Sequence, residues 1–379
     1  MAAHAVAGRR LALPGRSPAV LAVLTVLALA GAAALAAVAG AAIRPAAAAA
    51  TAQGIVDRWR IRTPVRAVTV AISDPDTGVR LITSGRERNE PVAADARFRV
   101  GSITKTFVAT VVMQLADEGR LRLDDPLSRY VPASPWADVT LRQLLSHTAG
   151  VPDHSHAAGF TDALLDRPAR RWTTAEVLDL VADRERAFAA GTSYAYSNTG
   201  YVVLGQVIQS VTGRPWAHAV RQRIIAPLGL GDTSIAGVDD AATDTVSGWF
   251  DTSGDGFDDR VSGPWPALDT TEGPAGALVS TAPDLVRFAR ALFDGDLVSR
   301  SANLEMTTPG PFHPPHSNYG LGVELRQPGY RTAVLGHSGS LPGYRATMWY
   351  EPGRRRVIVV LANAYRASTD DLAQLLLTR

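Results

Sequence analysis

Cysteine is absent from the 379 residues of this chain. The missing thiol excludes disulfide bonds, cysteine-ligated zinc sites and a thiol nucleophile. It also excludes the lipid-modified N-terminal cysteine that anchors some exported proteins. Any nucleophile or membrane anchor must therefore be built from other residue types.

Lysine is almost as scarce. Of the 38 basic residues, only Lys105 is a lysine, and all the others are arginines. A buried lysine can lose its proton at an accessible cost, whereas an arginine effectively stays charged. A lone lysine in an arginine background therefore indicates a position where arginine would not serve.

An excess of positive charge is also lacking once the N-terminal segment is set aside. Residues 1–50 contain four arginines and no acid, so the net charge of +2 becomes −2 for the remainder. No basic stripe is left to favour nucleic acid as a partner. With 46% hydrophobic and 20% charged residues, the chain reads as globular, and its length suits one large enzyme domain with an insertion.

The N-terminal segment has the order of an export signal. Three arginines precede a charge-free run over residues 19–43, and small residues follow at 46–50. The run is 25 residues long, enough to span a bilayer, but its alanine content makes membrane insertion weak. We favour a cleaved signal over a retained anchor and predict an extracytoplasmic protein, secreted or attached to the outer face of the membrane through residues 19–43.

Strand patterns lie at both ends of the chain. A helical pattern over 52–61 precedes an alternating strand over 65–72 that opens a hairpin. Near the C-terminus, residues 344–350 and 357–361 form a second antiparallel hairpin, and 369–377 are expected to form a closing helix. The fold class is therefore α/β (α+β), with an antiparallel sheet flanked by helices and a mainly helical region inserted.

This pattern predicts the domain organisation. Residues 1–50 form the signal peptide or anchor, and 51–379 form one catalytic domain. Within it, the sheet lobe comprises 51–115 and 270–379, and the helical lobe comprises 116–269.

The first chemical motif is Ser102-Ile-Thr-Lys105, at the start of a predicted helix. A spacing of three places both side chains on one helix face, and the helix N-terminus adds positive potential around the serine. A serine hydroxyl needs a base to become a nucleophile, and a desolvated lysine can serve. The pattern also arises by chance at a helix start, but the scarcity of lysine favours the catalytic interpretation.

The second motif is Tyr196-Ser197-Asn198. A phenol can pass a proton between nucleophile and leaving group, and an asparagine amide can hold both a substrate amide and the lysine. The alternative is a polar turn before a helix, with Asn198 as its cap.

The third motif is His337-Ser338-Gly339, followed by Ser340, directly after a predicted strand. A glycine there lets a substrate backbone lie against the strand edge. The two serine hydroxyls could bind a carboxylate, and the backbone N–H near Ser340 could form an oxyanion hole with that of Ser102. The alternative is a purely structural histidine.

Together, Ser-x-x-Lys, a polar-x-Asn triplet and a basic-x-Gly triplet are typical of β-lactamases and penicillin-binding proteins. Over about residues 55–375, the chain resembles the serine D-alanyl-D-alanine carboxypeptidase and class C β-lactamase superfamily. Tyr-Ser-Asn combined with His-x-Gly is most similar to secreted DD-carboxypeptidases, since class C β-lactamases usually carry lysine where this chain has His337. Related esterases and D-amino-acid peptidases share the first two motifs. The resemblance is carried by five segments: 98–105, 144–150, 194–198, 319–322 and 336–339.

The resemblance implies a role for each residue. Ser102 would attack the carbonyl, and Lys105 and Tyr196 would move its proton. Asn198 would orient the substrate and the lysine, and His337 would support the tyrosine or the substrate carboxylate. No cofactor is implied.

The activity implied is hydrolysis through an acyl-serine intermediate, with a D-alanyl-D-alanine carboxypeptidase acting on peptidoglycan-type peptides as the favoured function. An esterase or a β-lactamase of the same superfamily is the alternative, so the partners expected are small peptides, esters or β-lactams. A non-catalytic penicillin-binding sensor also stays open, although the complete residue set favours an enzyme.

One position departs from the resemblance. In some of these carboxypeptidases, an arginine closely follows the Tyr-Gly-Leu-Gly stretch and holds the substrate carboxylate. This chain has Glu324 there, with Arg326 on the same side of the expected strand. Either Arg326 substitutes or a carboxylate is not a feature of the substrate, which strengthens the esterase alternative.

Two further patterns concern metals. Residues 251–259 resemble the start of a calcium loop, but position twelve is Ser262 instead of glutamate, which favours a polar surface loop. His147, His154 and His156 lie close together in sequence. His147 belongs to a segment of the resemblance and the other two are expected to be exposed, so no metal site is predicted.

Overall fold

A computed structural model describes residues 51–239, 244–253, 259–261, 263–310, 312, 318–327 and 332–378. The predicted export segment lies outside the described residues. Within the described ranges, there is no helix whose length and apolarity would carry it across a membrane.

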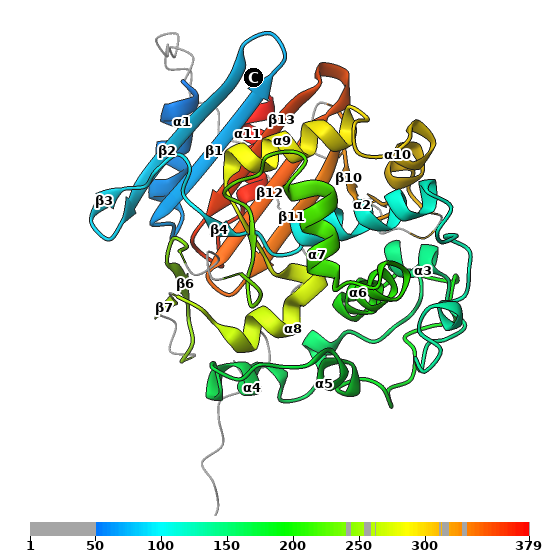
Figure 1. Ribbon diagram of the computed structural model, residues 1–379. Helices are drawn as coiled ribbons and strands as arrows, with labels where there is room; N and C mark the ends of the chain where they lie inside the picture. The colour runs from blue at the N-terminus through cyan, green and yellow to red at the C-terminus, as the bar shows by residue number, and fades with distance from the viewer. Residues whose placement is uncertain are drawn as a thin grey trace, which may run out of the picture.

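The main sheet has eight strands in the order β3-β2-β1-β13-β12-β11-β10-β9 (Figure 1). Neighbouring strands are antiparallel throughout, and β1 pairs with β13 so that Val68 lies opposite Ala362. The two ends of the chain therefore meet in the middle of one sheet, which confirms the predicted fold class. The strands are β1 (Ala67–Asp74), β2 (Gly78–Glu87), β3 (Glu90–Pro91), β9 (Asn318–Tyr319), β10 (Glu324–Arg326), β11 (Val334–Leu341), β12 (Tyr344–Glu351) and β13 (Arg356–Ala362).

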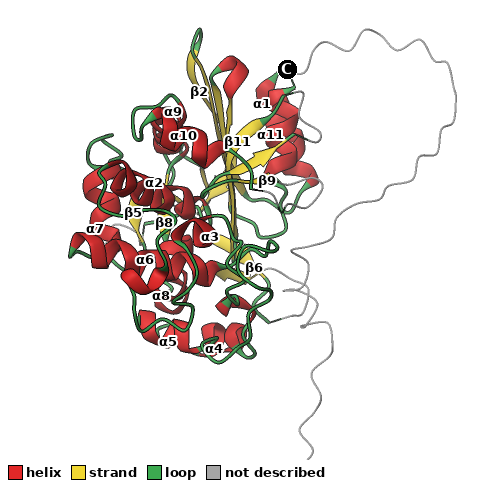
Figure 2. Ribbon diagram, turned by 90° about the vertical axis from the view of Figure 1, so that its right-hand side faces the viewer, coloured by secondary structure: helices red, strands yellow, loops and turns green. Residues whose placement is uncertain are grey.

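Helices cover both faces of this sheet (Figure 2). The terminal helices α1 (Ala52–Arg62) and α11 (Thr369–Leu377) pack on one face, against Val68, Val70 and Ile358. On the other face, α2 (Ile103–Asp117) and α9 (Ala282–Phe293) pack against Val359 and Leu361. Because both faces are covered, β13 reads as a continuous apolar run instead of an alternating one.

The middle of the chain is mainly helical, as predicted, and short strands lie within it and at its borders. The helices are α3 (Leu141–Leu145), α4 (Phe160–Asp166), α5 (Thr174–Asp179), α6 (Asn198–Thr212), α7 (Trp216–Val220) and α8 (Pro266–Gly276), with α10 (Arg300–Thr307) after α9. The short strands are β4 (Phe98–Arg99), β5 (Ser234–Ile235), β6 (Gly248–Phe250), β7 (Asp259–Val261) and β8 (Leu278–Ser280). The predicted lobe borders at 115/116 and 269/270 stay a prediction, and helices α2 and α8 run across them.

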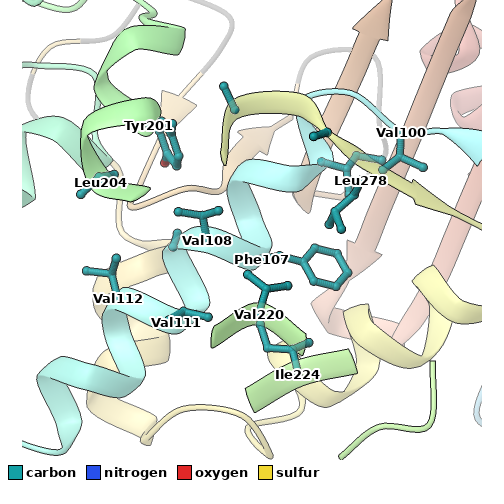
Figure 3. Packing of buried hydrophobic residues seen from close by; sticks show 14 of the residues in the cluster. Val100, Phe107, Val108, Val111, Val112, Tyr201, Leu204, Val220, Ile224 and Leu278 are labelled. Carbon is teal, nitrogen blue, oxygen red and sulfur yellow. The ribbon is translucent and has the colours of Figure 1, made fainter. Parts of the chain in front are cut away.

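Helix α2 is the central element of the core, with twelve of its fifteen residues buried. It contacts the sheet on one side and helices α6 and α8 on the other. The ring of Phe107 stacks on that of Phe288, with 3.6 Å between centroids. Figure 3 shows Val108, Val111 and Val112 of this helix among side chains from the neighbouring elements. The first turn of α2 is therefore held rigidly at the junction between sheet and helices.

Candidate active site

Ser102 and Lys105 lie together at the N-terminal end of α2. Ser102 is the residue that precedes the helix, and its Oγ accepts a hydrogen bond of 3.0 Å from the ammonium Nζ of Lys105. The lysine also donates to Asn198 Oδ1 at 2.7 Å and to the carbonyl of Ala275 at 2.8 Å. Two of the predicted motifs therefore meet at one nitrogen.

Lys105 is fully buried, and this changes its acidity. Burial lowers the pKa of Lys105 because the charged form loses its hydration, while the carboxylates of Glu272, Asp153 and Glu324 partly restore it. The pKa settles at about 8. A neutral amine at 3.0 Å from the Ser102 hydroxyl can act as its general base.

A kink in α8 supplies the third lysine contact. Gly273 has φ 38° and ψ −122°, a conformation that side chains rarely adopt, and Pro274 follows it. The break frees the carbonyl of Ala275 to face Lys105. Helix α6 accommodates the kink because a Cβ on Gly205 would lie 2.5 Å from Pro274 Cγ.

The Tyr-Ser-Asn segment leads into α6. Ser197 caps this helix through its Oγ, which accepts from the N–H of Gly200 at 3.3 Å, so the alternative of Asn198 as the cap is wrong. Asn198 is instead the first helical residue. Its Nδ2 donates to Asp153 Oδ2 at 3.0 Å, which fixes Oδ1 toward Lys105.

The Tyr196 hydroxyl is buried and makes no hydrogen bond of ordinary geometry within the described part of the chain. Burial raises the pKa of Tyr196 well above its usual range, and the neighbouring Ser102 hydroxyl offsets part of that rise. Its ring lies 4.8 Å from Lys105 Nζ and 4.2 Å from the ring of His147. A neutral phenol that is not engaged elsewhere suits a proton relay between serine, lysine and leaving group.

His337 lies in β11 with 1% of its surface exposed. Its Nδ1 is 3.1 Å from Glu324 Oε1, and its Nε2 is 2.9 Å from the Tyr319 hydroxyl. Nδ1 also lies 2.5 Å from the carbonyl oxygen of Ser338. Both acceptors require the proton on Nδ1, so Nε2 accepts from the tyrosine. Burial lowers the pKa of His337 to about 4 although Glu324 opposes this, so the ring is neutral at neutral pH. Its centroid lies 6.4 Å from that of Tyr196, and its hydrogen bonds go to other partners.

The edge of β11 that was predicted to receive a substrate faces away from β12. Ser338 N–H donates to Glu324 Oε1 at 3.0 Å, so it points away from β12. Successive residues of an antiparallel strand alternate between its two edges. The N–H of Ser340 therefore points to the same edge as that of Ser338.

Two glycines bring this edge to the start of α2. A Cβ on Gly339 would lie 1.9 Å from the carbonyl oxygen of Val100 and 3.2 Å from Ser102 N. Gly101 has φ +53°, and a Cβ there would lie 2.8 Å from Ser340 N. The N–H groups of Ser102 and Ser340 are therefore neighbours across a glycine-only contact, as an oxyanion hole requires.

This fold and site match known proteins. A family model described as Beta-lactamase matches residues 33–377. The chain belongs to the Beta-lactamase family. It carries the motifs of the serine β-lactamase and penicillin-binding protein superfamily, as the sequence predicted.

Individual relatives of this Beta-lactamase family chain differ in their named activities. Penicillin-binding protein 4 of Amycolatopsis lactamdurans is 36% identical over 210 residues, 54% of this chain and 52% of that protein. The D-stereospecific amidohydrolase of Streptomyces sp. superposes with a TM-score of 0.77 at 30% identity, covering 85% of this chain and 96% of that one. The D-amino acid amidase of Ochrobactrum anthropi SV3 gives 0.77 at 30%, covering 86% and 96%. The chain spans between about half and two thirds of the length of the curated relatives it matches first.

Glu324 is more central to the site than the sequence indicated. It accepts from Arg326 Nε and Nη2 at 3.0 and 2.7 Å, from the Ser338 hydroxyl at 2.8 Å, and from the Ser338 N–H. Burial alone would raise the pKa of Glu324, but Arg326 and His337 outweigh it and lower the pKa to about 2. The carboxylate is therefore ionised at every working pH.

Sequence reasoning missed two other acids beside Lys105. The carboxylate of Asp153 accepts from the backbone N–H of Asn198, at 3.1 Å, and from the side-chain amide of Asn198. Burial raises the pKa of Glu272 to about 7, although the charge of Lys105 opposes the rise. Asp153 lies in a loop and Glu272 directly precedes the α8 kink, so neither has a local signal that points to the site.

The histidines and the acidic loop give no metal site within the described residues, where no group of three potential ligands occurs. His154 corrects an expectation, because it is buried instead of exposed: its N–H donates to Thr199 Oγ1 at 2.8 Å. The turn that carries it packs on the start of α6, and His156 is exposed as expected. Residues 254–258 and 262 of the calcium-like pattern lie outside the described residues.

Proposed function

We propose that this protein hydrolyses small amides, peptides or esters of D-amino acids through an acyl-serine intermediate on Ser102. The observation that carries the proposal is the position of Lys105. Its fully buried Nζ lies 3.0 Å from the Ser102 hydroxyl and is held on its other side by Asn198 at 2.7 Å. A purely structural cation at this position could also be an arginine. A lysine is required only if the group must lose its proton.

The reaction follows from these contacts. Neutral Lys105 accepts the Ser102 proton as Oγ attacks the substrate carbonyl, and the N–H groups of Ser102 and Ser340 hold the oxyanion. Collapse breaks the bond to the leaving group, which receives the proton through Tyr196. Water then attacks the acyl-serine, gives a proton to the same relay and releases the acid, which restores the serine.

Two substrate classes have support. The D-alanyl-D-alanine carboxypeptidase predicted from the motifs is supported by the likeness to a penicillin-binding protein. Amide hydrolysis is supported by the likeness to a D-stereospecific amidohydrolase and a D-amino acid amidase, 96% of each being covered. The carboxylate of Glu324 beside the predicted substrate edge favours the amide class.

The experiment measures three products side by side. Purified protein is given acyl-D-Ala-D-Ala, a series of D-amino acid amides and a short-chain ester, with D-alanine, ammonia and alcohol release as readouts. Ammonia release that is lost in Ser102→Ala supports the amidase, and D-alanine release supports the carboxypeptidase. An intact protein with no turnover or acylation by any of the substrates would refute the proposed function.

We also propose that the protein acts outside the cytoplasm, on the basis of the charge-free run over residues 19–43 and the small residues that follow. Fractionation of expressing cells, with the N-terminus of the product determined by mass spectrometry, tests this. Cytoplasmic protein with residues 1–50 intact would contradict it.

A further inference from the structure

The carboxylate of Glu324 lies at the edge of β11, where the pairing with β10 stops. Strand β10 pairs with β11 from Arg326 opposite Val334 to Glu324 opposite Gly336. Gly322 has φ +75°, and a Cβ there would lie 2.2 Å from that of Ala109, so the chain turns against α2 before it can pair further. The N–H of the next residue on this edge of β11 therefore needs another acceptor.

Glu324 is that acceptor. Its Oε1 takes both the N–H and the hydroxyl of Ser338, at 3.0 and 2.8 Å. Ser338 is the residue whose hydroxyl was predicted to bind a substrate carboxylate. Because this hydroxyl donates to Glu324, it has no second proton to offer to a substrate anion.

The distance along β11 between Glu324 and the expected position of the scissile carbonyl equals the length of one substrate residue. Ser338 and Ser340 present their N–H groups on the same edge, two residues apart, which is about 7 Å along a strand. With the scissile carbonyl at Ser340, a group one amino acid further along the substrate can lie at Glu324. In a D-Ala-D-Ala peptide, that group is the terminal carboxylate.

Among the described residues, carboxylates outnumber guanidinium groups at this position. Arg326 contacts both Glu324 and Asp370. Asp370 is held in place by the indole N–H of Trp349 at 2.7 Å. The side chain of Glu324 is only 9% exposed, so solvent screens its charge weakly. That charge extends to the catalytic groups, since it opposes the lowering of the Lys105 pKa by burial and adds to the rise that burial causes in the pKa of Tyr196.

We propose that Glu324 is a specificity-determining residue that excludes substrates with a free carboxylate one residue beyond the scissile carbonyl and admits those with an uncharged or cationic group there. This inference rests on the proposed hydrolase function. It assigns the substrate class as amides, esters and internal peptide bonds, in preference to free D-alanyl-D-alanine termini.

The test uses one scissile bond in two forms: acyl-D-Ala-D-Ala with a free carboxylate, and the same peptide as its terminal amide. For the wild-type protein, we expect kcat/KM for the amide to exceed that for the carboxylate by about tenfold or more, as like charges at close range imply. In Glu324→Gln, the ratio should fall toward one, chiefly through a lower KM for the carboxylate. Glu185→Gln, an exposed site in the helical region, is the matched control and should keep the wild-type ratio.

The outcomes separate the two levels of the proposal. If the wild-type protein cleaves both peptides with similar kcat/KM, or prefers the free carboxylate, the role of Glu324 is overturned while the hydrolase function stands. If it cleaves neither peptide nor an uncharged activated ester, the hydrolase function fails and the inference with it. The wild-type ratio is decisive even if Glu324→Gln does not fold.

Discussion

Lys105 illustrates how burial changes the chemistry of a single residue. In water, the pKa of its ammonium group would be about 10.4. In this protein, burial outweighs the nearby carboxylates and lowers the pKa to about 8. The same desolvation acts on His337, whose pKa falls to about 4 and whose ring is therefore a neutral support for Tyr319 and Glu324.

The pH profile of activity should follow from these two shifts. The base form of Lys105 accumulates as pH rises through about 8, so kcat/KM for an uncharged ester should rise to a plateau above that pH. His337 is already neutral above about pH 5, so it contributes no step near pH 6.5, and a step near pH 7 is assigned to Glu272 beside the lysine. Initial rates between pH 5 and 10 measure this.

Lys105→Arg serves as the control, because a guanidinium keeps its proton across this range. We expect it to be inactive at every pH. A wild-type kcat/KM that does not rise through about pH 8, or an active Lys105→Arg, would contradict the role assigned to the lysine.

At the scale of elements, the site depends on the contact between β11 and the start of α2. The contact leaves no room for a side chain at Gly339, where a Cβ would overlap the carbonyl of Val100 at 1.9 Å. The kink of α8 acts in the same way, since it turns the Ala275 carbonyl toward Lys105. The site therefore depends on the precise positions of backbone groups, namely the N–H groups at the start of α2 and in β11 and the carbonyl of Ala275.

Gly339→Ala should therefore separate β11 from the start of α2. Removal of one oxyanion donor costs about 100- to 1,000-fold in kcat in serine hydrolases, and we expect a loss of that size. Gly353→Ala is the matched control, because a Cβ there meets no atom within 4 Å. Near-normal turnover by a folded Gly339→Ala protein would be incompatible with the oxyanion hole described above.

These contacts explain how much the sequence could predict. Ser102 and Lys105 are three positions apart on one helix, so local geometry alone brings them together, and the strand patterns at both ends of the chain gave the sheet. Asp153 and Glu272 reach the lysine only through a loop and a kinked helix, whose paths depend on tertiary packing. His154 was expected to be exposed for the same reason, since a short polar turn carries no periodic signal of burial.

Glu324 was partly predictable from the sequence. The sequence marked it as a departure, and a period of two placed it on one side of a strand with Arg326. Its bonds to Ser338 could not be predicted, because they exist only where β10 stops pairing with β11.

At the scale of the whole molecule, one core joins the sheet to the helical region. Its cluster of buried residues extends from the sheet face under α9 through α2 to α6 and α7. Helix α2 belongs to both parts, and its N-terminal end carries Ser102, the proposed nucleophile. Loss of packing in this helix should therefore destabilise the fold and the site together.

Phe107→Ala tests this coupling. Truncation of a fully buried phenylalanine typically costs about 3–5 kcal/mol of the free energy of unfolding. Urea unfolding followed by tryptophan fluorescence and by residual activity should give coincident midpoints, both lowered. Leu304→Ala, at a site 67% exposed, should change stability by less than about 0.5 kcal/mol. Separate transitions for the two probes would show that the sheet and the helical region unfold independently.

The acyl-serine intermediate is the centre of this account, and its direct observation is the most decisive measurement. The protein is mixed with an activated ester, quenched in acid and analysed by intact-mass and peptide mass spectrometry. We predict a mass increase equal to the acyl group, located on the peptide that contains Ser102 and absent from Ser102→Ala, whose turnover should fall by about 10⁴-fold or more. An unmodified wild-type protein during turnover, with undiminished activity in Ser102→Ala, would contradict the account.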